Sequence, residues 1–395
     1  MALPSVNVSV TNENFVITKS EDSSEYLAGI LLPDNTELIN AVGTTGEVTE
    51  KFMTVNSLED WWGRLSSNLG NSSGIDFDGF SAGTIATIDG ESRWPSGPTG
   101  NWKNQWWTCQ NYLRYGGRAV IGVSSAAPFT SNNTHNLNTG FCTESGSSGD
   151  LSTILTTRDN DFLGIFKIED VTSGVPAGAN SNKIYVFGSK LVIPIGDDPS
   201  NVVNDSDYIE IGLDSDVAGC LARTARVSNV WDAPAGMKRG QIVDGDNLKT
   251  PLTAVQATNL YNNRINPVLG FPESGTVLFG NKTGATAGSI DDRIEVSSLI
   301  VFLKREIGLF AKEVLFERNN TASRQSFVNR ATSVLDEVKS QGGVSDFSVI
   351  CDETNNTDSS IAQGNFVADI FIKPFKSVEF LKISFTNKNQ DTNIT

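Results

Sequence analysis

The sequence contains few of the residues that carry most protein chemistry. Among its 395 residues there are four cysteines and a single histidine. The cysteines stand far apart, so none has the spacing of a metal-ligand or redox pair, and we expect reduced, mostly buried thiols at Cys109, Cys142, Cys220 and Cys351. His135 lies in the polar stretch SNNTHNLNTG, which is typical of a solvated loop. We therefore predict no catalytic residue, metal site or cofactor; a hydrolase using His135 or paired carboxylates is the enzyme alternative.

Long apolar runs and positive charge are also scarce. The longest apolar run, 299–303, is far shorter than the roughly 20 residues that span a membrane. The first ten residues, MALPSVNVSV, lack the basic and apolar regions of a secretory signal, so we expect synthesis in the cytoplasm. With 30 basic and 46 acidic side chains, the net charge of −16 disfavours binding to nucleic acid or to an anionic membrane.

The acidic residues and the aromatic residues are unevenly distributed. Residues 1–250 carry 16 basic and 30 acidic side chains, all seven tryptophans and most of the Gly/Ser/Asn-rich loops. Residues 251–395 carry 14 basic and 16 acidic side chains and the clearer helical patterns. Gly, Asp and Pro cluster at 239–251, as at a boundary. We predict an α+β fold with an acidic, loop-rich domain over 26–245 and a mixed α/β domain over 246–375.

Helical periodicity is clearest in the second part of the chain. A helix is predicted from Asp291 to Val314, capped by Ser289 or Asp291, because apolar residues recur there at steps of three and four. A second helix is predicted over 322–341, ended by Gly342 and Gly343, with Phe327, Ala331, Val334 and Val338 facing inward. Shorter helices are predicted over 106–115 and 216–226.

Both ends of the chain have strand patterns. Val6, Val8 and Val10 alternate with polar residues, and 366–372 and 378–385 are strand-like. The apolar phase changes within 378–385, which predicts a bulge near Phe380. A short strand with one apolar face gains little alone, so each needs a sheet to join. We assign an N-terminal strand arm to 1–25 and a C-terminal strand arm to 376–395.

Four segments, in order along the chain, resemble hallmarks of contractile tail sheath proteins. They are NYLRYGGRAVIGVSS (111–125), VAGCLARTARVSNVWDAPAGMKRGQI (217–242), LYNNRINPVLGFPESGTVLFGNKT (260–283) and the block 302–357. The last block is the most diagnostic: a helix, F-E-x-N, a helix, G-x-x-x-x-F and a strand end with N-N-T. Ala225 stands where the family often has Asp, and 126–216 aligns with nothing in the family.

The resemblance implies a structural protein without catalytic activity. Copies of a sheath subunit stack helically around a rigid tail tube and contract to drive the tube through the host envelope. It also implies that 246–375 is an inner domain and that 26–245 is displayed outward. The implied partners are further copies of the chain, the tail tube protein, and baseplate and tail terminator proteins, without nucleic acid or membrane insertion. The implied location is the virion, after synthesis in the host cytoplasm.

In this family the terminal arms complete the sheets of neighbouring subunits. The resemblance therefore implies inter-subunit strand contacts by Val6, Val8, Val10, Phe380, Ile383 and Phe385. Main-chain hydrogen bonds would give such strands affinity, and alternating side chains would fix their register. The alternative is that both segments are ordinary strands of a closed monomer.

A basic segment in this part of the chain lines the sheath lumen in family members. The resemblance therefore implies that Arg318, Arg324 and Arg330 face the tube, where they would meet acidic groups. Residues six apart do not form one helical stripe, so some of them must lie on a loop or flank. The alternative is a solvated helix surface.

Two other segments suggest binding functions of a different class. The stretch from Trp94 to Trp107 could stack on sugar rings, which makes a carbohydrate-binding or fibre-type surface protein the alternative function. Core packing is the simpler use of Trp106 and Trp107, because they lead directly into a predicted helix. The Asp-rich stretch 196–216 could hold calcium, but it lacks the spacing of a known calcium loop.

Overall fold

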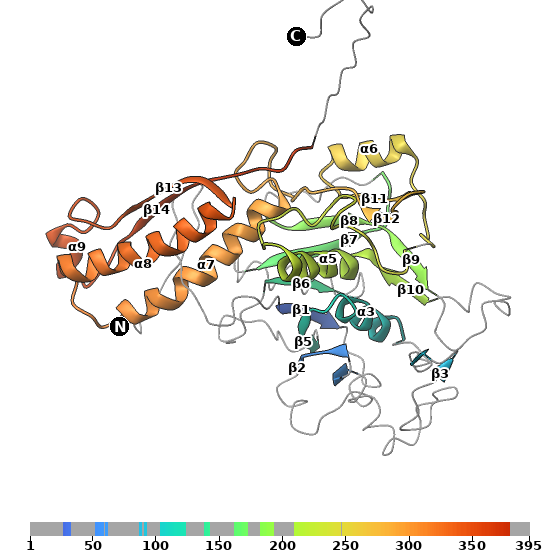
Figure 1. The fold of residues 1–395 in the computed structure, drawn as a ribbon, viewed down its shortest axis with the longest axis horizontal. Coiled ribbons are helices and arrows are strands. Elements are labelled where there is room, and N and C mark those ends of the chain that lie inside the picture. The colour runs from blue at the N-terminus through green and yellow to red at the C-terminus, as the bar shows by residue number, and fades with distance from the viewer. Residues whose placement is uncertain are drawn as a thin grey trace, which may run out of the picture.

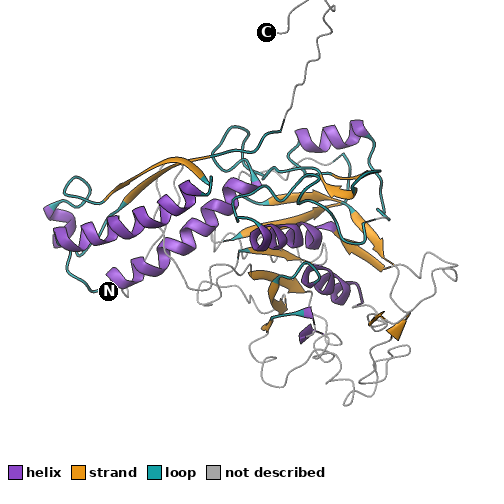
Figure 2. Cartoon of the chain, in the orientation of Figure 1, coloured by secondary structure: helices purple, strands orange, loops and turns teal. Residues whose placement is uncertain are grey.

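The computed structural model describes residues 27–32, 52–58, 60–61, 87–88, 91–92, 103–123, 138–142, 162–172, 182–192, 209–245 and 247–379. Within these ranges helices and strands are mixed, which confirms the predicted α+β class (Figure 2). No helix in them is long and apolar enough to cross a membrane.

A six-stranded sheet forms the centre of the described structure (Figure 1). Its strands are, in spatial order, β2 (Phe52–Val55), β5 (Arg118–Val123), β1 (Leu27–Leu32), β6 (Thr139–Cys142), β7 (Leu163–Ile168) and β8 (Ile184–Phe187). Only the edge strand β2 runs antiparallel. Helix α5 (Leu213–Val227) packs across β6, β7 and β8, and α3 (Lys103–Leu113) packs beside α5. This helical cover suits parallel strands, which bury both faces.

Short elements surround this sheet. Antiparallel pairs are formed by β3 (Thr87–Ile88) with β4 (Glu91–Ser92), β9 (Ser189–Val192) with β10 (Ile209–Gly212), and β11 (Val268–Phe271) with β12 (Gly275–Leu278). Helix α6 (Ala254–Asn262) begins with a capping box, in which Thr253 and Gln256 each bind the other's backbone N–H.

The C-terminal part is a helical hairpin covered by a two-stranded sheet. Helices α7 (Ile294–Val314) and α8 (Thr321–Ser340) pack together, and β13 (Val344–Ile350) lies on α8. Strand β14 (Asp369–Pro374) pairs with β13, and the short helix α9 (Asp358–Ala362) lies between them in the chain. A compact apolar cluster fills this layer, including Leu303, Phe310, Phe327, Leu335 and Ile370.

Helix α7 connects this layer to the central sheet. Its Ile294 and Val301 belong to the apolar cluster of the sheet, while its Leu299, Leu303 and Ile307 belong to the cluster of the helical hairpin. The sheet's cluster also includes residues on both sides of position 245, from Ile30 in β1 to Leu278 in β12. The boundary at 245/246 stays a prediction.

The predicted helices are present, with some ends displaced. Helix α8 ends before Gly342, whose φ of +77° suits glycine, and Phe327, Ala331 and Val338 are buried as predicted. Val334 is only partly buried, and the missed residue Leu335 takes the fully buried position. The predicted start of α7 is wrong: the helix begins at Ile294, with Arg293 as N-cap. Residues 289–292 form a turn, and Arg293 is extended and forms an isolated antiparallel bridge with Lys282.

Three of the four cysteines are free and buried, as expected: Cys109, Cys220 and Cys351. Burial raises the pKa of the Cys220 thiol to about 12 and that of Cys351 to about 11. The Cys142 side chain lies outside the described part of the structure.

A buried polar cluster fastens α3 and α5 to β9. The Lys190 ammonium and the Asp216 carboxylate are 2.9 Å apart, and both side chains are fully buried. Lys190 also donates to Asn111 Oδ1 at 2.8 Å and to the Val243 carbonyl. Tyr115 donates to the same carboxylate oxygen at 2.7 Å and accepts from the Val243 N–H at 2.8 Å. Each charge therefore has several partners, which buried ions require.

We predict that Lys190→Met strongly destabilises the protein, because it leaves the Asp216 carboxylate buried and without its cation. The free energy of unfolding should fall by about 3–5 kcal/mol in urea titrations. The matched control is Lys249→Met, which breaks the more exposed pair of Lys249 with Glu210 and should cost no more than about 1 kcal/mol. Equal losses for the two variants would contradict this account.

Candidate assembly site at the root of the C-terminal segment

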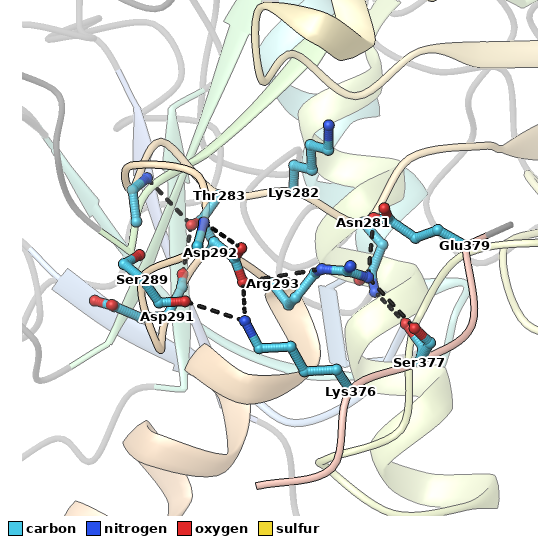
Figure 3. Close-up of polar contacts among 12 residues, drawn as sticks. Asn281, Lys282, Thr283, Ser289, Asp291, Asp292, Arg293, Lys376, Ser377 and Glu379 are labelled. Atoms are coloured by element: carbon cyan, nitrogen blue, oxygen red, sulfur yellow. Dashed lines mark hydrogen bonds and ion pairs between the residues drawn. The ribbon is translucent and has the colours of Figure 1, made fainter.

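The segment 375–379 follows β14 and runs past the start of α7 without belonging to a strand (Figure 3). It lies against the loop between β12 and α7 and is held there by side chains from both. We call residues 375–379 the C-terminal segment and their polar contacts the anchor. The chain leaves the described structure at Glu379.

The centre of the anchor is Glu295, in the first turn of α7, which is 3% exposed. Its Oε1 accepts hydrogen bonds from the Ser377 N–H at 3.0 Å and from the Ser377 hydroxyl at 2.8 Å. Its Oε2 accepts from the Asn281 amide, which also contacts Ser377 Oγ at 3.1 Å. A carboxylate is favourable here, because the N-terminus of a helix has a partial positive charge.

Two ion pairs flank Glu295. The Arg293 guanidinium lies 2.9 Å from the Glu379 carboxylate, with both side chains about 15% exposed. The Lys376 ammonium lies 2.6 Å from Asp292 Oδ1 and donates to the Ser289 carbonyl at 3.1 Å. Figure 3 shows Lys376, Ser377 and Glu379 of the C-terminal segment opposite the loop that carries Asn281, Asp292 and Arg293. Charge-assisted hydrogen bonds are stronger than neutral ones, so the segment is fixed at several points.

The anchor perturbs two neighbouring groups. Burial, together with the hydrogen bond donated to Glu379, raises the pKa of Tyr261. Burial lowers the pKa of Lys282, whose ammonium lies 3.8 Å from the centroid of the Tyr261 ring. Lys282 points away from the ion pairs in Figure 3, and it forms no ion pair within the described part of the chain.

A cleft of about 690 Å³ opens beside the anchor. Its walls come from the 233–239 loop, α6, the β11–β12 hairpin and the C-terminal segment, and they are mainly apolar, including Ala257, Tyr261, Pro267, Leu269 and Phe279. Lys282, Arg239 and Glu379 are its charged residues. The geometry suits the binding of an apolar protein group beside a cation, and it brings together no set of groups for catalysis.

The predicted arm residues fall outside the described ranges: Val6, Val8, Val10, Phe380, Ile383 and Phe385. Their inter-subunit role stays a prediction. Of the predicted strand 378–385, the described residues are Val378, which is 82% exposed, and Glu379.

The three arginines predicted to face the tube have different surroundings. Arg324 is 5% exposed, and it pairs with Glu353 at 2.6 Å. Arg330 pairs with Glu313 and lies 4.6 Å above the Phe310 ring. Arg318 is exposed, in the α7–α8 connection, and forms no ion pair with a described residue. The two helical arginines therefore contact different neighbours, and their role toward a tube remains a prediction.

The segments with alternative functions are described only in part. Trp107 is 3% exposed in the core of the sheet, as core packing requires, and His135 lies outside the described ranges. In the Asp-rich stretch, Asp216 is bound by Lys190, and burial raises the pKa of Asp214 to about 7. No group of three or more His, Cys, Asp or Glu side chains that could hold a metal occurs among the described residues.

Reasoning from the sequence missed the anchor. The sequence signals for the anchor are two short stretches that each carry both charges, Asp292–Arg293 and Lys376–Glu379. Lys376 and Asp292, which pair in the structure, are 84 residues apart in the sequence. Glu295 itself gives no clear signal, because a carboxylate in the first turn of a helix is common.

We predict that Glu295→Gln loosens the C-terminal segment while the rest of the fold persists. All three groups that face the carboxylate donate hydrogen bonds, and the amide NH₂ of Gln would meet donors. The Ser377 amide hydrogen should exchange with solvent about 10–100-fold faster, because the variant loses the free energy that a hydrogen bond to a charged group contributes. The control is Glu313→Gln, which changes an exposed carboxylate on the same helix. Unchanged exchange at Ser377 would show that Glu295 does not hold the segment.

Comparison with known proteins identifies the C-terminal part most directly. The family model described as phage tail sheath C-terminal domain matches residues 291–387. The tail sheath protein of Vibrio phage KVP40 is 42% identical over 181 residues, which is 46% of this chain and 27% of that protein. The tail sheath protein of Enterobacteria phage T4 is 41% identical over 175 residues, 44% of this chain and 27% of that protein. The aligned part thus spans about a quarter of the length of these relatives.

Solved structures share the fold over nearly the whole chain. A chain of the anti-feeding prophage baseplate superposes with a TM-score of 0.69 at 15% identity, covering 98% of this chain and 99% of that chain. A chain of the PVC sheath complex of an extracellular contractile injection system, in the contracted state, also gives 0.69 at 15% identity, covering 98% of each. The four sequence hallmarks, the family match over 291–387 and the fold agree: the chain contains a region similar to the phage tail sheath C-terminal domain and shares the fold of a contractile sheath complex.

Proposed function

We propose that the chain is a structural subunit of a contractile tail sheath. Many copies would assemble helically around a tail tube, and the sheath would shorten to drive the tube through the envelope of a bacterial host. The observation that supports this most strongly is the match of nearly the entire fold to a chain of a contracted sheath complex. The free energy of contraction would lie in contacts between subunits that improve in the short state, so the extended state is metastable.

The proposed partners follow from the same assembly. They are further copies of the chain, a tube protein inside the sheath, and baseplate and terminator proteins at its ends. The protein would be made in the host cytoplasm and reside in the virion. Residues 246–375 would form the inner domain and 26–245 the outer one.

The terminal arms are proposed to connect neighbouring subunits. The sheet of β13 and β14 has two strands, so each strand keeps one open edge within the described ranges. A two-stranded sheet is marginal alone, and strands from other copies could extend it through main-chain hydrogen bonds. The anchor supports this role, because it fixes Ser377 and Glu379, the last described residues before 380–395.

The function is tested by negative-stain microscopy of the purified protein. We expect hollow, striated tubes for the full chain. Deleting 380–395 retains Glu379 and the anchor, so this variant should stay folded, with an unchanged melting temperature, but form no long tubes. Discrete particles from the full chain under all assembly conditions would count against a sheath. Normal tubes from the truncated chain would show that the C-terminal arm does not connect subunits.

We propose that Arg318 makes the main contact with the tube, because its side chain is exposed in the α7–α8 connection. An exposed ion pair contributes only about 0.2–1 kcal/mol, which suits a contact that must release when the sheath widens. Arg318→Glu should leave folding and sheath self-assembly unchanged, but extended sheaths around tubes should give way to empty contracted ones. Lys238→Glu, at another exposed cation, is the control. Arg324→Glu should instead destabilise the fold, since that side chain is buried.

If Arg318→Glu gives extended tails at wild-type yield, Arg318 does not contact the tube. The counts of extended and contracted particles, made on the same micrographs, provide the measurement.

A further inference from the structure

The connection between α7 and α8 places an aromatic side chain in an unfavourable position. The Glu317 N–H donates to the Val314 carbonyl at 3.1 Å and closes a turn. Leu315 has φ −60° and ψ 133°, and Phe316 has φ +69°. These are the angles of a type II turn, whose third residue is normally glycine because φ is positive there. Phe316 is nevertheless 87% exposed, so within this chain its ring gains almost no burial in return.

The cleft beside the anchor is a site in which an aromatic ring such as that of Phe316 could be buried. Its apolar walls remain partly open to solvent, since Phe279 is 47% and Val378 82% exposed. An aromatic side chain that enters such a cleft removes apolar surface of both partners from water.

The charges beside the ring and in the cleft are complementary. Glu317, next to Phe316, is exposed and forms no ion pair among the described residues. Lys282 lines the cleft and likewise has no carboxylate partner in the described part of the chain. Glu379, the acidic group of the cleft, is already paired with Arg293.

Phe316 cannot reach the cleft of its own chain. The cleft adjoins the first turn of α7, where Asn281 binds Glu295, and Phe316 follows the last turn of the same helix. The 21 residues of α7 separate the two by about 30 Å at 1.5 Å per residue. Figure 1 shows the α7–α8 connection and α6 far apart along the long axis. Contact between them therefore requires a second copy.

We propose that Phe316 of one copy inserts into the cleft of a neighbouring copy, with Glu317 facing Lys282. The inference rests on the proposed sheath function and names one contact between copies in the sheath. Such a contact joins different surfaces of the two copies, so it leaves a free ring on one and a free cleft on the other. Repetition of a heterologous contact generates an open helical assembly.

The first test separates stability from assembly. Phe316→Gly should keep or raise the melting temperature, because glycine tolerates the positive φ. Phe316→Gly and Phe316→Ala should each raise the protein concentration needed for tube formation by about tenfold or more, as expected for a buried aromatic anchor. The control is Val227→Ala, which truncates another apolar side chain that is mostly exposed (75%) and lies outside the cleft. Wild-type assembly by both Phe316 variants would overturn the proposal and leave the sheath function intact.

The second test does not depend on tubes. Differently tagged copies of Phe316→Cys and Phe279→Cys are mixed under mild oxidation, and disulfide-linked heterodimers are measured. We expect them to exceed by at least about tenfold those from Phe316→Cys mixed with Val227→Cys. If the full chain forms no tubes but this cross-link appears, the contact stands and the sheath function fails. Equal cross-linking in the two mixtures would overturn the contact.

Discussion

One buried carboxylate determines how the C-terminal end of the chain is attached to the body. Glu295 accepts three hydrogen bonds in the first turn of α7, two from Ser377 and one from Asn281. Because a buried anion without donors would be costly, these groups must stay together for the helix to begin where it does. The same turn carries Ile294 into the apolar core of the sheet. The anchor thus lies directly beside the start of α7 and the central core.

The two buried carboxylate clusters have different roles. Asp216 is fully enclosed with Lys190 and holds helices and strands within the body, where nothing needs to move. The anchor around Glu295 lies at the edge, where its ion pairs are only partly buried. Several moderate contacts in parallel hold the C-terminal segment, since each partly buried ion pair alone would be weak.

Much of the C-terminal part could be predicted from the sequence. Helices α7 and α8 follow from apolar residues at steps of three and four, and Gly342 marks the end of α8. The parallel sheet could not be predicted from the sequence, because apolar and polar residues do not alternate in short strands that are buried on both faces. The anchor was missed because its contacts join residues far apart in the chain. The burial of Arg324 was missed because its partner, Glu353, comes from the connection beyond β13.

Helix α7 has the anchor at one end and the turn with Phe316 at the other. A helix cannot be stretched gradually; its length changes only in steps of about 1.5 Å and 100° for each residue added or removed. The spacing of these two surfaces along the helix can therefore change only in such steps, and in the proposed contact between copies α7 would set this spacing. Substitutions along its exposed face leave that spacing unchanged, whereas a single inserted residue would turn the ring of Phe316 away from the site proposed for it on a neighbouring copy. Variation in the length of α7 should for this reason be far rarer than variation in its sequence.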